Sequence, residues 1–176
     1  IIIGTLHGRT PKDELEKILN NLHPDQLFVE LTPLEFTELN PKKSIRDEMI
    51  FAVGWARNHN VHVYRFDRQE GELKEGITGK EPAFIGLSQE MDKVLKNYSW
   101  KELNKMEIWQ KPPLVDIENK IKEKFIDEKR LREREEYMLE NINKQVTQKG
   151  KVVILTGVGH LPFFEKRIQG AKPFFK

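Results

Sequence analysis

Two apolar segments at opposite ends of the chain limit the fold more than any other feature. Residues 1–7 read Ile-Ile-Ile-Gly-Thr-Leu-His, and residues 151–160 read Lys-Val-Val-Ile-Leu-Thr-Gly-Val-Gly-His. Each contains a short β-branched run typical of a strand buried in a parallel sheet, and each ends in a Gly-x-x-His sequence. Ligands and catalytic groups collect beyond the carboxyl ends of parallel strands, so we expect His7 and His160 at one edge of the sheet.

The first part of the chain alternates between strand and helix patterns. Apolar residues at helical spacing follow Thr10-Pro11, and Ser44 to Asp47 resembles a capping box that begins a second helix. The expected strands in this part are 1–6, 26–31 and 61–67, the expected helices are 10–22 and 44–58, and a loop is expected between Pro33 and Pro41. With right-handed crossovers this order predicts an α/β fold: a mainly parallel central sheet of about four or more strands with flanking helices.

The third and last strands are separated by a long stretch of different character. Residues 68–86 form a polar loop without periodicity, and residues 87–148 show helical spacing. We expect helices at 87–97 and 99–109, then a helical segment from Leu114 with a break near Asp127. The sequence therefore predicts a single domain over residues 1–176 in which the helical insertion at 87–148 covers the site, and a short final helix from Leu161.

Composition excludes several classes of protein. The 30 basic and 28 acidic residues nearly balance, so charge gives no indication of nucleic-acid binding. There is no cysteine, so disulfides, thiolate ligands and a cysteine nucleophile are excluded, and any metal would be held by histidines and carboxylates. No apolar run approaches the roughly 20 residues of a membrane span. We expect a cytoplasmic or soluble segment without a membrane span.

Each expected strand ends at an ionisable residue, namely His7, Glu30, Asp67 or His160. Two imidazoles and one or two carboxylates at one sheet edge suit a divalent cation such as Mn, Co or Zn with coordination positions open to water. We therefore predict that His7, Glu30 and His160 are metal ligands, with Glu30 as ligand or base. Glu30 interrupts an apolar strand, where an unpaired carboxylate would cost several kcal/mol.

Simpler interpretations stand beside this one. Either histidine alone is compatible with a hydrogen-bonded loop residue, and Glu30 with a solvated strand end. An ordinary salt bridge to the flanking arginines would explain Asp67 equally well as a catalytic role. The charged run 133–136 is typical of a solvated helix face, although Arg134 is the kind of residue that reaches in from a cap to bind a substrate carbonyl or carboxylate. The remaining histidines are better explained as surface or packing residues: His23, His59 and His62.

At these residues the chain resembles the TraB/PrgY family, which includes Tiki-type metalloproteases and GumN-like proteins. The matching blocks, in order, are Ile3–His7, Phe28–Leu31, Phe66–Arg68, Glu133–Met138 and Val153–Pro162. The resemblance implies a parallel α/β core with a helical insertion and, for Tiki-type members, a divalent-metal-dependent peptidase that uses the paired histidines and a glutamate. Carried over, His7, Glu30 and His160 would be metal or catalytic residues and Arg134 a basic residue near the site. The chain departs from the family after Leu31, where Thr32-Pro33 follows and the next arginine is Arg46.

Two functions remain open at this level. The first is a metal-dependent hydrolase of peptide or other acyl bonds, in which Glu30, Asp67 and Arg134 are catalytic candidates and a peptide or small molecule is the substrate. The second is a non-catalytic, regulatory module that binds a peptide or small ligand on the same fold. In either case the insertion offers a surface for homo-oligomerisation through Trp100, Met106 and Trp109, although such a stripe is more often core.

Overall fold

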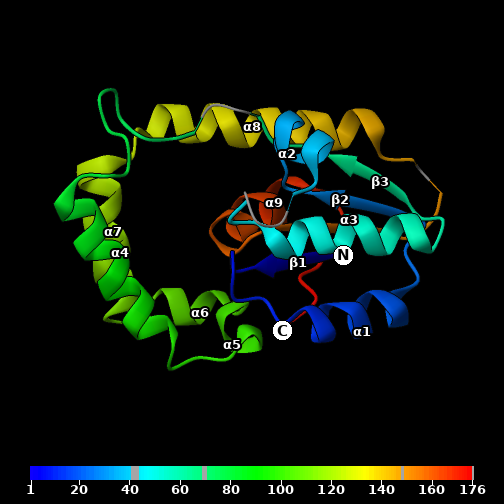
Figure 1. The fold of residues 1–176 in the computed structure, drawn as a ribbon, viewed down its shortest axis with the longest axis horizontal. Helices are drawn as coiled ribbons and strands as arrows, with labels where there is room; N and C mark the ends of the chain where they lie inside the picture. The colour runs from blue at the N-terminus through cyan, green and yellow to red at the C-terminus, as the bar shows by residue number, and fades with distance from the viewer. Residues whose placement is uncertain (41–43, 69–70, 148, 176) are drawn as a thin grey trace.

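The computed structural model describes residues 1–40, 44–68, 71–147 and 149–175, and shows an α/β fold around a parallel sheet (Figure 1). The four strands are β1 (Ile2–Thr5), β2 (Gln26–Val29), β3 (His62–Arg65) and β4 (Val152–Gly157). They lie in the order β1-β4-β2-β3, and all neighbouring pairs are parallel. The predicted fold class is confirmed, and the last strand in sequence lies between the first two.

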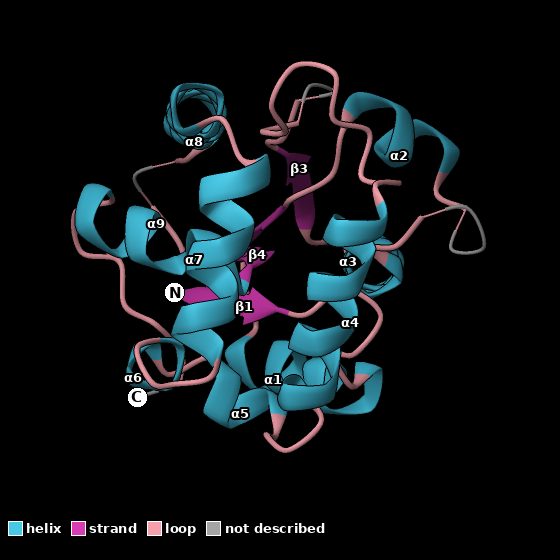
Figure 2. Ribbon diagram, turned by 90° about the vertical axis from the view of Figure 1, so that its left-hand side faces the viewer, coloured by secondary structure: helices cyan, strands magenta, loops and turns pink. Residues whose placement is uncertain are grey.

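Both faces of the sheet are buried, which explains the uninterrupted apolar runs. Side chains alternate between the faces, so neighbouring residues of one strand enter different cores. Ile3 and Leu155 pack with α1 (Lys12–Leu22) and α3 (Asp47–Asn58), whereas Ile2 and Ile154 pack with the helices of the opposite face. Figure 2 shows the sheet between these two layers.

The insertion is helical, as predicted, and lies to one side of the sheet before α8 returns across it (Figure 1). Among the described residues, no helix is long and apolar enough to cross a lipid bilayer. The remaining helical elements are α2 (Pro33–Glu38), α4 (Pro82–Leu95), α5 (Trp100–Leu103), α6 (Met106–Trp109), α7 (Leu114–Phe125), α8 (Glu128–Gln145), the 3-10 turn η1 (Val158–His160) and α9 (Leu161–Arg167).

The predicted helix breaks are partly confirmed. The break near Asp127 is present, because this residue caps α8 by accepting hydrogen bonds from the backbone N–H groups of Lys129 and Arg130. The helix expected at 87 begins at Pro82 instead, and the one expected over 99–109 is divided into α5 and α6. Gln148, the last residue of the predicted insertion, lies outside the described residues.

The stripe considered as a surface for homo-oligomerisation belongs to the core. Trp100 is buried, and Met106 and Trp109 are half-buried against the core.

Two predictions around the second strand were wrong. The loop expected from Pro33 contains α2, whose capping box is formed by Thr32 and Glu35, because proline is tolerated in the first turn of a helix. Pro41, the other end of that loop, is outside the described residues. Ser44 does not cap α3; its hydroxyl donates to Glu35 and accepts from the backbone N–H of Arg46, so it stabilises the loop before the helix.

The outer edge of β1 is covered by other parts of the chain. The backbone N–H of Ile2 donates to the carbonyl of Lys172, and its carbonyl accepts from the N–H of Phe174. At Gly4 the N–H donates to Asn104 Oδ1, and the carbonyl accepts from Asn104 Nδ2 and Trp100 Nε1. The hydrogen-bonding groups that an edge strand would present to a partner are therefore already used.

Candidate functional site

The carboxyl ends of the strands bring the predicted residues together around Glu30, which follows β2. The Glu30 side chain is almost fully buried. Its Oε2 atom accepts hydrogen bonds from the Thr156 hydroxyl and the Gly157 backbone N–H, both at 2.7 Å. Its Oε1 atom accepts from Arg134 Nη2 at 3.0 Å. The carboxylate is thus held on one side by the end of β4 and on the other by helix α8.

His7 approaches this carboxylate from the loop after β1. Its Nδ1 atom lies 2.8 Å from Glu48 Oε1, on α3, and Glu48 is completely buried. An ionised carboxylate only accepts hydrogen bonds, so the proton of this contact is on Nδ1, and in the neutral form of the ring the lone pair is on Nε2. A Cβ atom on Gly157 would lie 3.7 Å from His7 Nε2 and 3.5 Å from Glu30 Oε2. The imidazole and the carboxylate therefore border one space beside this glycine.

His160 approaches Glu30 from the 3-10 turn after β4 with the same arrangement. Its Nδ1 atom lies 3.0 Å from Glu135 Oε1, on α8, and its Nε2 atom lies 3.7 Å from Glu30 Oε1. Both Gly-x-x-His histidines are thus anchored at Nδ1 by a carboxylate, while Nε2 of His160 lies near Glu30 and Nε2 of His7 borders the same space beside Gly157 as Glu30 does.

Arg134 is fully engaged with protein carboxylates. Its Nε and Nη2 atoms donate to the two oxygens of Asp67 at 2.9 and 2.7 Å, and Nη2 also donates to Glu30. Its Nη1 atom donates to Glu72 at 2.6 Å. All three guanidinium nitrogens bind protein side chains, and these contacts place Arg134 beside Glu30, where it holds the carboxylate in position.

Asp67 lies behind Arg134 and is completely buried. Besides Arg134, its carboxylate accepts from Arg46 Nη1 at 2.9 Å and from the backbone N–H of Arg68 at 2.8 Å. Of the flanking arginines, Arg65 donates to the backbone carbonyl of Asp67 at 3.4 Å. Asp67 thus forms salt bridges with Arg46 and Arg134, which are distant from it in sequence, and its position is that of a support for Arg134.

Arg46, Glu48 and Glu135 belong to the site and were not predicted. The Nη1 atom of Arg46 donates to the Glu30 backbone carbonyl at 3.0 Å, and its Nη2 atom lies 3.8 Å from Glu30 Oε1. A signal existed for Glu48, because it lies one helical turn before Ala52 on the apolar stripe of α3, where a charged residue needs a partner. Arg46 and Glu135 carry no comparable signal in the sequence.

Burial and charge act in opposite directions on the titrating groups. Burial alone would raise the pKa of Glu30, but the positive groups of His160, Arg46, Arg134 and His7 outweigh it and lower the pKa to about 2. Burial acts to lower the pKa of His160, but the neighbouring Glu30 and Glu135 raise it by more than that. The net shift of this pKa is therefore upward. The carboxylate at the centre of the site therefore stays ionised over the whole physiological range.

The donor set has the chemistry of a divalent-metal site. Among the described residues, no group of three or more His, Asp or Glu side chains is placed closely enough to hold an ion as it stands. However, ligands about 2.0–2.1 Å from a tetrahedral ion lie about 3.4 Å apart, and His160 Nε2 is 3.7 Å from Glu30 Oε1. A histidine anchored by a carboxylate through its other nitrogen is also the usual environment of a metal ligand. The spacing of His160 and Glu30 is therefore close to that of two ligands of one ion.

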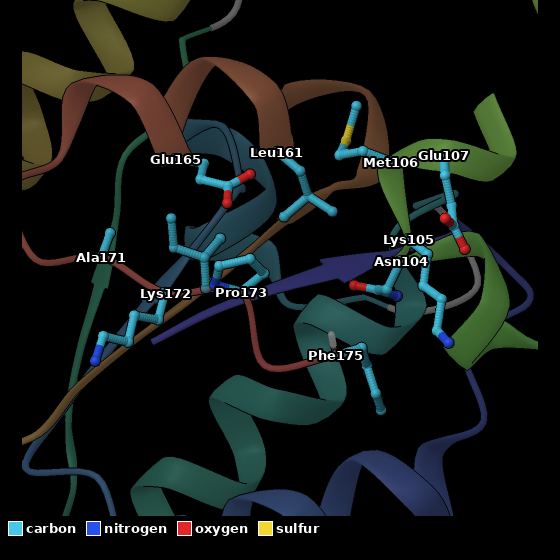
Figure 3. Close-up of a pocket in the computed structure, with 11 residues that line it drawn as sticks. Asn104, Lys105, Met106, Glu107, Leu161, Glu165, Ala171, Lys172, Pro173 and Phe175 are labelled. Carbon is cyan, nitrogen blue, oxygen red and sulfur yellow. The ribbon is translucent and has the colours of Figure 1, made fainter. Parts of the chain in front are cut away.

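Two cavities lie on opposite sides of α9. The first, of about 500 Å³, begins at His160 and Glu135 and extends between α7, α8 and α9; we call it the α7–α9 cavity. The second, of about 620 Å³, lies between α6, α9 and the C-terminal segment, with Met106, Leu161 and Pro173 among its walls (Figure 3). The second cavity contains none of the residues gathered around Glu30.

Comparison of the chain with family models, curated proteins and solved structures finds no match. The similarity to the TraB/PrgY family therefore stays a prediction that rests on the five sequence blocks.

Proposed function

We propose that this chain is a TraB/Tiki-like metal-dependent hydrolase, acting on peptide or other acyl bonds at the carboxyl ends of the sheet strands. The observation that carries the proposal is the matched pair of histidines, each fixed at Nδ1 by a carboxylate, with Nε2 of His160 close to Glu30 and Nε2 of His7 beside the space at Gly157 that Glu30 also borders. Together His7, Glu30 and His160 would hold a divalent ion such as Mn, Co or Zn. When bound, such an ion supplies Lewis-acid polarisation of a carbonyl and a water of lowered pKa.

The other residues of the site have supporting roles in this proposal. Glu48 and Glu135 accept hydrogen bonds from the Nδ1 atoms of the two imidazoles, so an ion would bind at Nε2 and displace any proton there. Arg134 fixes the orientation of the Glu30 carboxylate, and Asp67 holds Arg134 in place. Glu30 itself suits a ligand better than a general base, because a base works best with a pKa near the working pH and that of Glu30 is about 2.

The direct test is the metal content of purified protein. Wild-type protein exposed to Mn, Co or Zn and then desalted should retain about one ion per chain by elemental analysis, because three protein ligands define one site. The His7→Ala/His160→Ala variant should retain none and should not cleave a peptide mixture analysed by mass spectrometry. His62→Ala, which alters an exposed histidine outside the site, is the control. Full metal content in the double variant would falsify the proposal.

One observation favours a second function, a non-catalytic module that binds peptides or small ligands. Glu30, Asp67 and Arg134 satisfy one another without an ion, as in a purely structural network. A thermal-shift screen with Mn, Co, Zn and Ca separates the two functions, because an ion that binds the folded state selectively raises the melting temperature. A rise with one or more of these ions supports the hydrolase, and no response to any of them supports the binding module.

A further inference from the structure

The α7–α9 cavity has apolar walls that the protein itself leaves partly uncovered. Its apolar lining consists of Ile121, Ile126, Leu131, Pro162 and Phe163, and all five residues are half-buried. Ile121, Ile126 and Leu131 are outside the three buried clusters found in the described part of the chain. The volume of about 500 Å³ lies within the range of small-ligand pockets, roughly 300–1,000 Å³.

The cavity opens directly onto the candidate metal site. Its inner end is formed by Glu72, Glu135 and His160, each already paired within the site: Glu72 with Arg134, and Glu135 with His160. A group bound beside His160 therefore has a continuous path into the space between α7 and α9.

Within the described ranges, one positively charged side chain of the cavity lining has no oppositely charged partner. Glu118 pairs with Lys122 at 2.6 Å on α7, so these two charges neutralise each other. Lys166, on α9, is exposed, and within the described ranges it has no ion-pair partner. It follows His160 by six residues, about 9 Å along a helix at 1.5 Å per residue. An extended peptide covers about 3.3–3.6 Å per residue, so Lys166 is two to three residues away from a group held at His160.

We propose that the α7–α9 cavity binds the C-terminal end of a short peptide, with an apolar side chain between Ile121, Leu131 and Phe163 and the terminal carboxylate at Lys166. The order along the substrate, with the bond to be cleaved near His160, rests on the proposed hydrolase function. Binding of an apolar residue that carries a free carboxylate does not rest on that function, because the apolar walls and Lys166 can contact such a residue without a bound ion.

The test uses metal-stripped protein, so that no bound ion attracts the carboxylate. N-acetyl-L-leucine is titrated into the full chain while the methyl signals of Ile121, Ile126 and Leu131 are followed by NMR. N-acetyl-L-leucinamide, which lacks the charge, and N-acetylglycine, which lacks the apolar side chain, are titrated in parallel. We expect the acid to shift these methyl signals saturably and to bind at least about tenfold more tightly than either analogue, because the amide lacks the charge-assisted contact and N-acetylglycine lacks the apolar side chain that the walls would bury.

The charge reversal Lys166→Glu changes an exposed residue and should reduce the affinity for N-acetyl-L-leucine to that of the amide. Lys101→Glu, an exposed lysine on α5 that does not line the cavity, should leave the affinity unchanged. Equal affinities for acid and amide, shifts at other methyl groups, or an unaltered affinity in Lys166→Glu would overturn the proposal. The same titration of His7→Ala separates it from the hydrolase function, because a variant without metal should still bind the acid.

Discussion

At the scale of single residues, the site is defined by which nitrogen of each histidine is occupied. Glu48 and Glu135 accept hydrogen bonds from the Nδ1 atoms of His7 and His160, and the Nε2 atoms are the ring nitrogens nearest to the site around Glu30. The two supporting carboxylates come from different helices, so the similarity of their contacts does not follow from local sequence. A carboxylate behind a metal-bound histidine raises the basicity of that histidine, so the roles of Glu48 and Glu135 can be tested through metal affinity.

Replacement of the supporting carboxylates should weaken metal binding without removing a ligand. Glu48→Gln and Glu135→Gln should each lower the affinity by about 10–100-fold, the usual effect of losing a partner behind a metal-bound histidine. Calorimetric titration with Zn measures the change. Glu140→Gln, on the exposed face of α8 and paired with Lys144, is the matched control and should bind as the wild type does. Unchanged affinity in both test variants would contradict the assigned roles.

The lowered pKa of Glu30 makes a specific prediction about acid stability. Folding shifts this pKa from 4.5 to about 2, so the contribution of Glu30 to stability is complete above about pH 4.5 and is lost as the pH falls towards 2. The difference in unfolding free energy between metal-stripped wild type and Glu30→Gln should therefore be largest at neutral pH and shrink between pH 4.5 and 2. Urea unfolding at several pH values measures this difference in free energy, and a difference independent of pH would contradict the assignment.

The raised pKa of His160 has the opposite dependence on pH. It adds stability below about pH 6.5, and this stability is lost as the pH rises through the pKa of His160 in the folded protein.

At the scale of elements, the two Gly-x-x-His segments use their glycines for different purposes. A Cβ atom on Gly4 would lie 2.7 Å from Asn104 Oδ1 and from a methyl group of Leu161, inside contact distance. The equivalent atom on Gly157 would make ordinary contacts of 3.5 Å or more with Glu30 and His7. The first glycine permits close packing at the edge of the sheet, and the second leaves space inside the candidate site.

Alanine substitutions should separate these purposes. Gly4→Ala should lower the unfolding free energy by about 1–3 kcal/mol through overpacking. Gly157→Ala should leave stability within about 0.5 kcal/mol but reduce metal binding, since its methyl group occupies the space between His7 and Glu30. Denaturant unfolding and metal titration of each variant provide the comparison. Gly159→Ala, with no atom within 4 Å of the added carbon, is the control for both measurements. Equal destabilisation by all three substitutions would show that packing does not distinguish the glycines.

The sequence predicts the elements better than it predicts their contacts. The strands, the parallel sheet and the edge that carries His7, Glu30, Asp67 and His160 follow from apolar periodicity and from the rule for strand ends. Helix α2 is absent from the prediction because Pro33 suggests a loop, whereas proline is also favoured where a helix begins. The partners of the site residues were missed because ion pairs such as Arg134 to Glu30 span 104 positions and have no local pattern.

At the scale of the whole molecule, the buried charges join the insertion to the sheet. Arg134, from α8, binds Glu30 after β2, Asp67 after β3 and Glu72 in the loop that follows. That loop is itself attached to the turn between α7 and α8, where the backbone N–H of Asp127 donates to the carbonyl of Glu72. The insertion therefore completes the candidate site instead of merely covering it, and its docking and the stability of the core should be coupled.

Loss of Arg134 should destabilise the whole chain. Arg134→Ala leaves Glu30 and Asp67 as buried charges with fewer partners, which typically costs about 3–5 kcal/mol. Arg134→Lys should not restore full stability, since an ammonium group cannot bind Asp67 through two parallel hydrogen bonds. Chemical denaturation measures both. The neighbouring Arg132→Ala removes only an exposed pair with Glu128 and should change stability by no more than about 1 kcal/mol. A similar small change for Arg134→Ala would mean that the insertion docks independently of this network.

The covered edge of β1 has a consequence for how copies of this protein can associate. Growth of a fibre by strand pairing requires two free edges on each molecule, one to receive a neighbour and one to offer the next. Here Lys172, Phe174, Asn104 and Trp100 occupy the hydrogen-bonding groups of β1, and β3 forms the opposite end of the sheet. Pairing between native molecules through their sheets must therefore stop at two copies joined at β3, and a growing polymer would first have to displace the C-terminal segment.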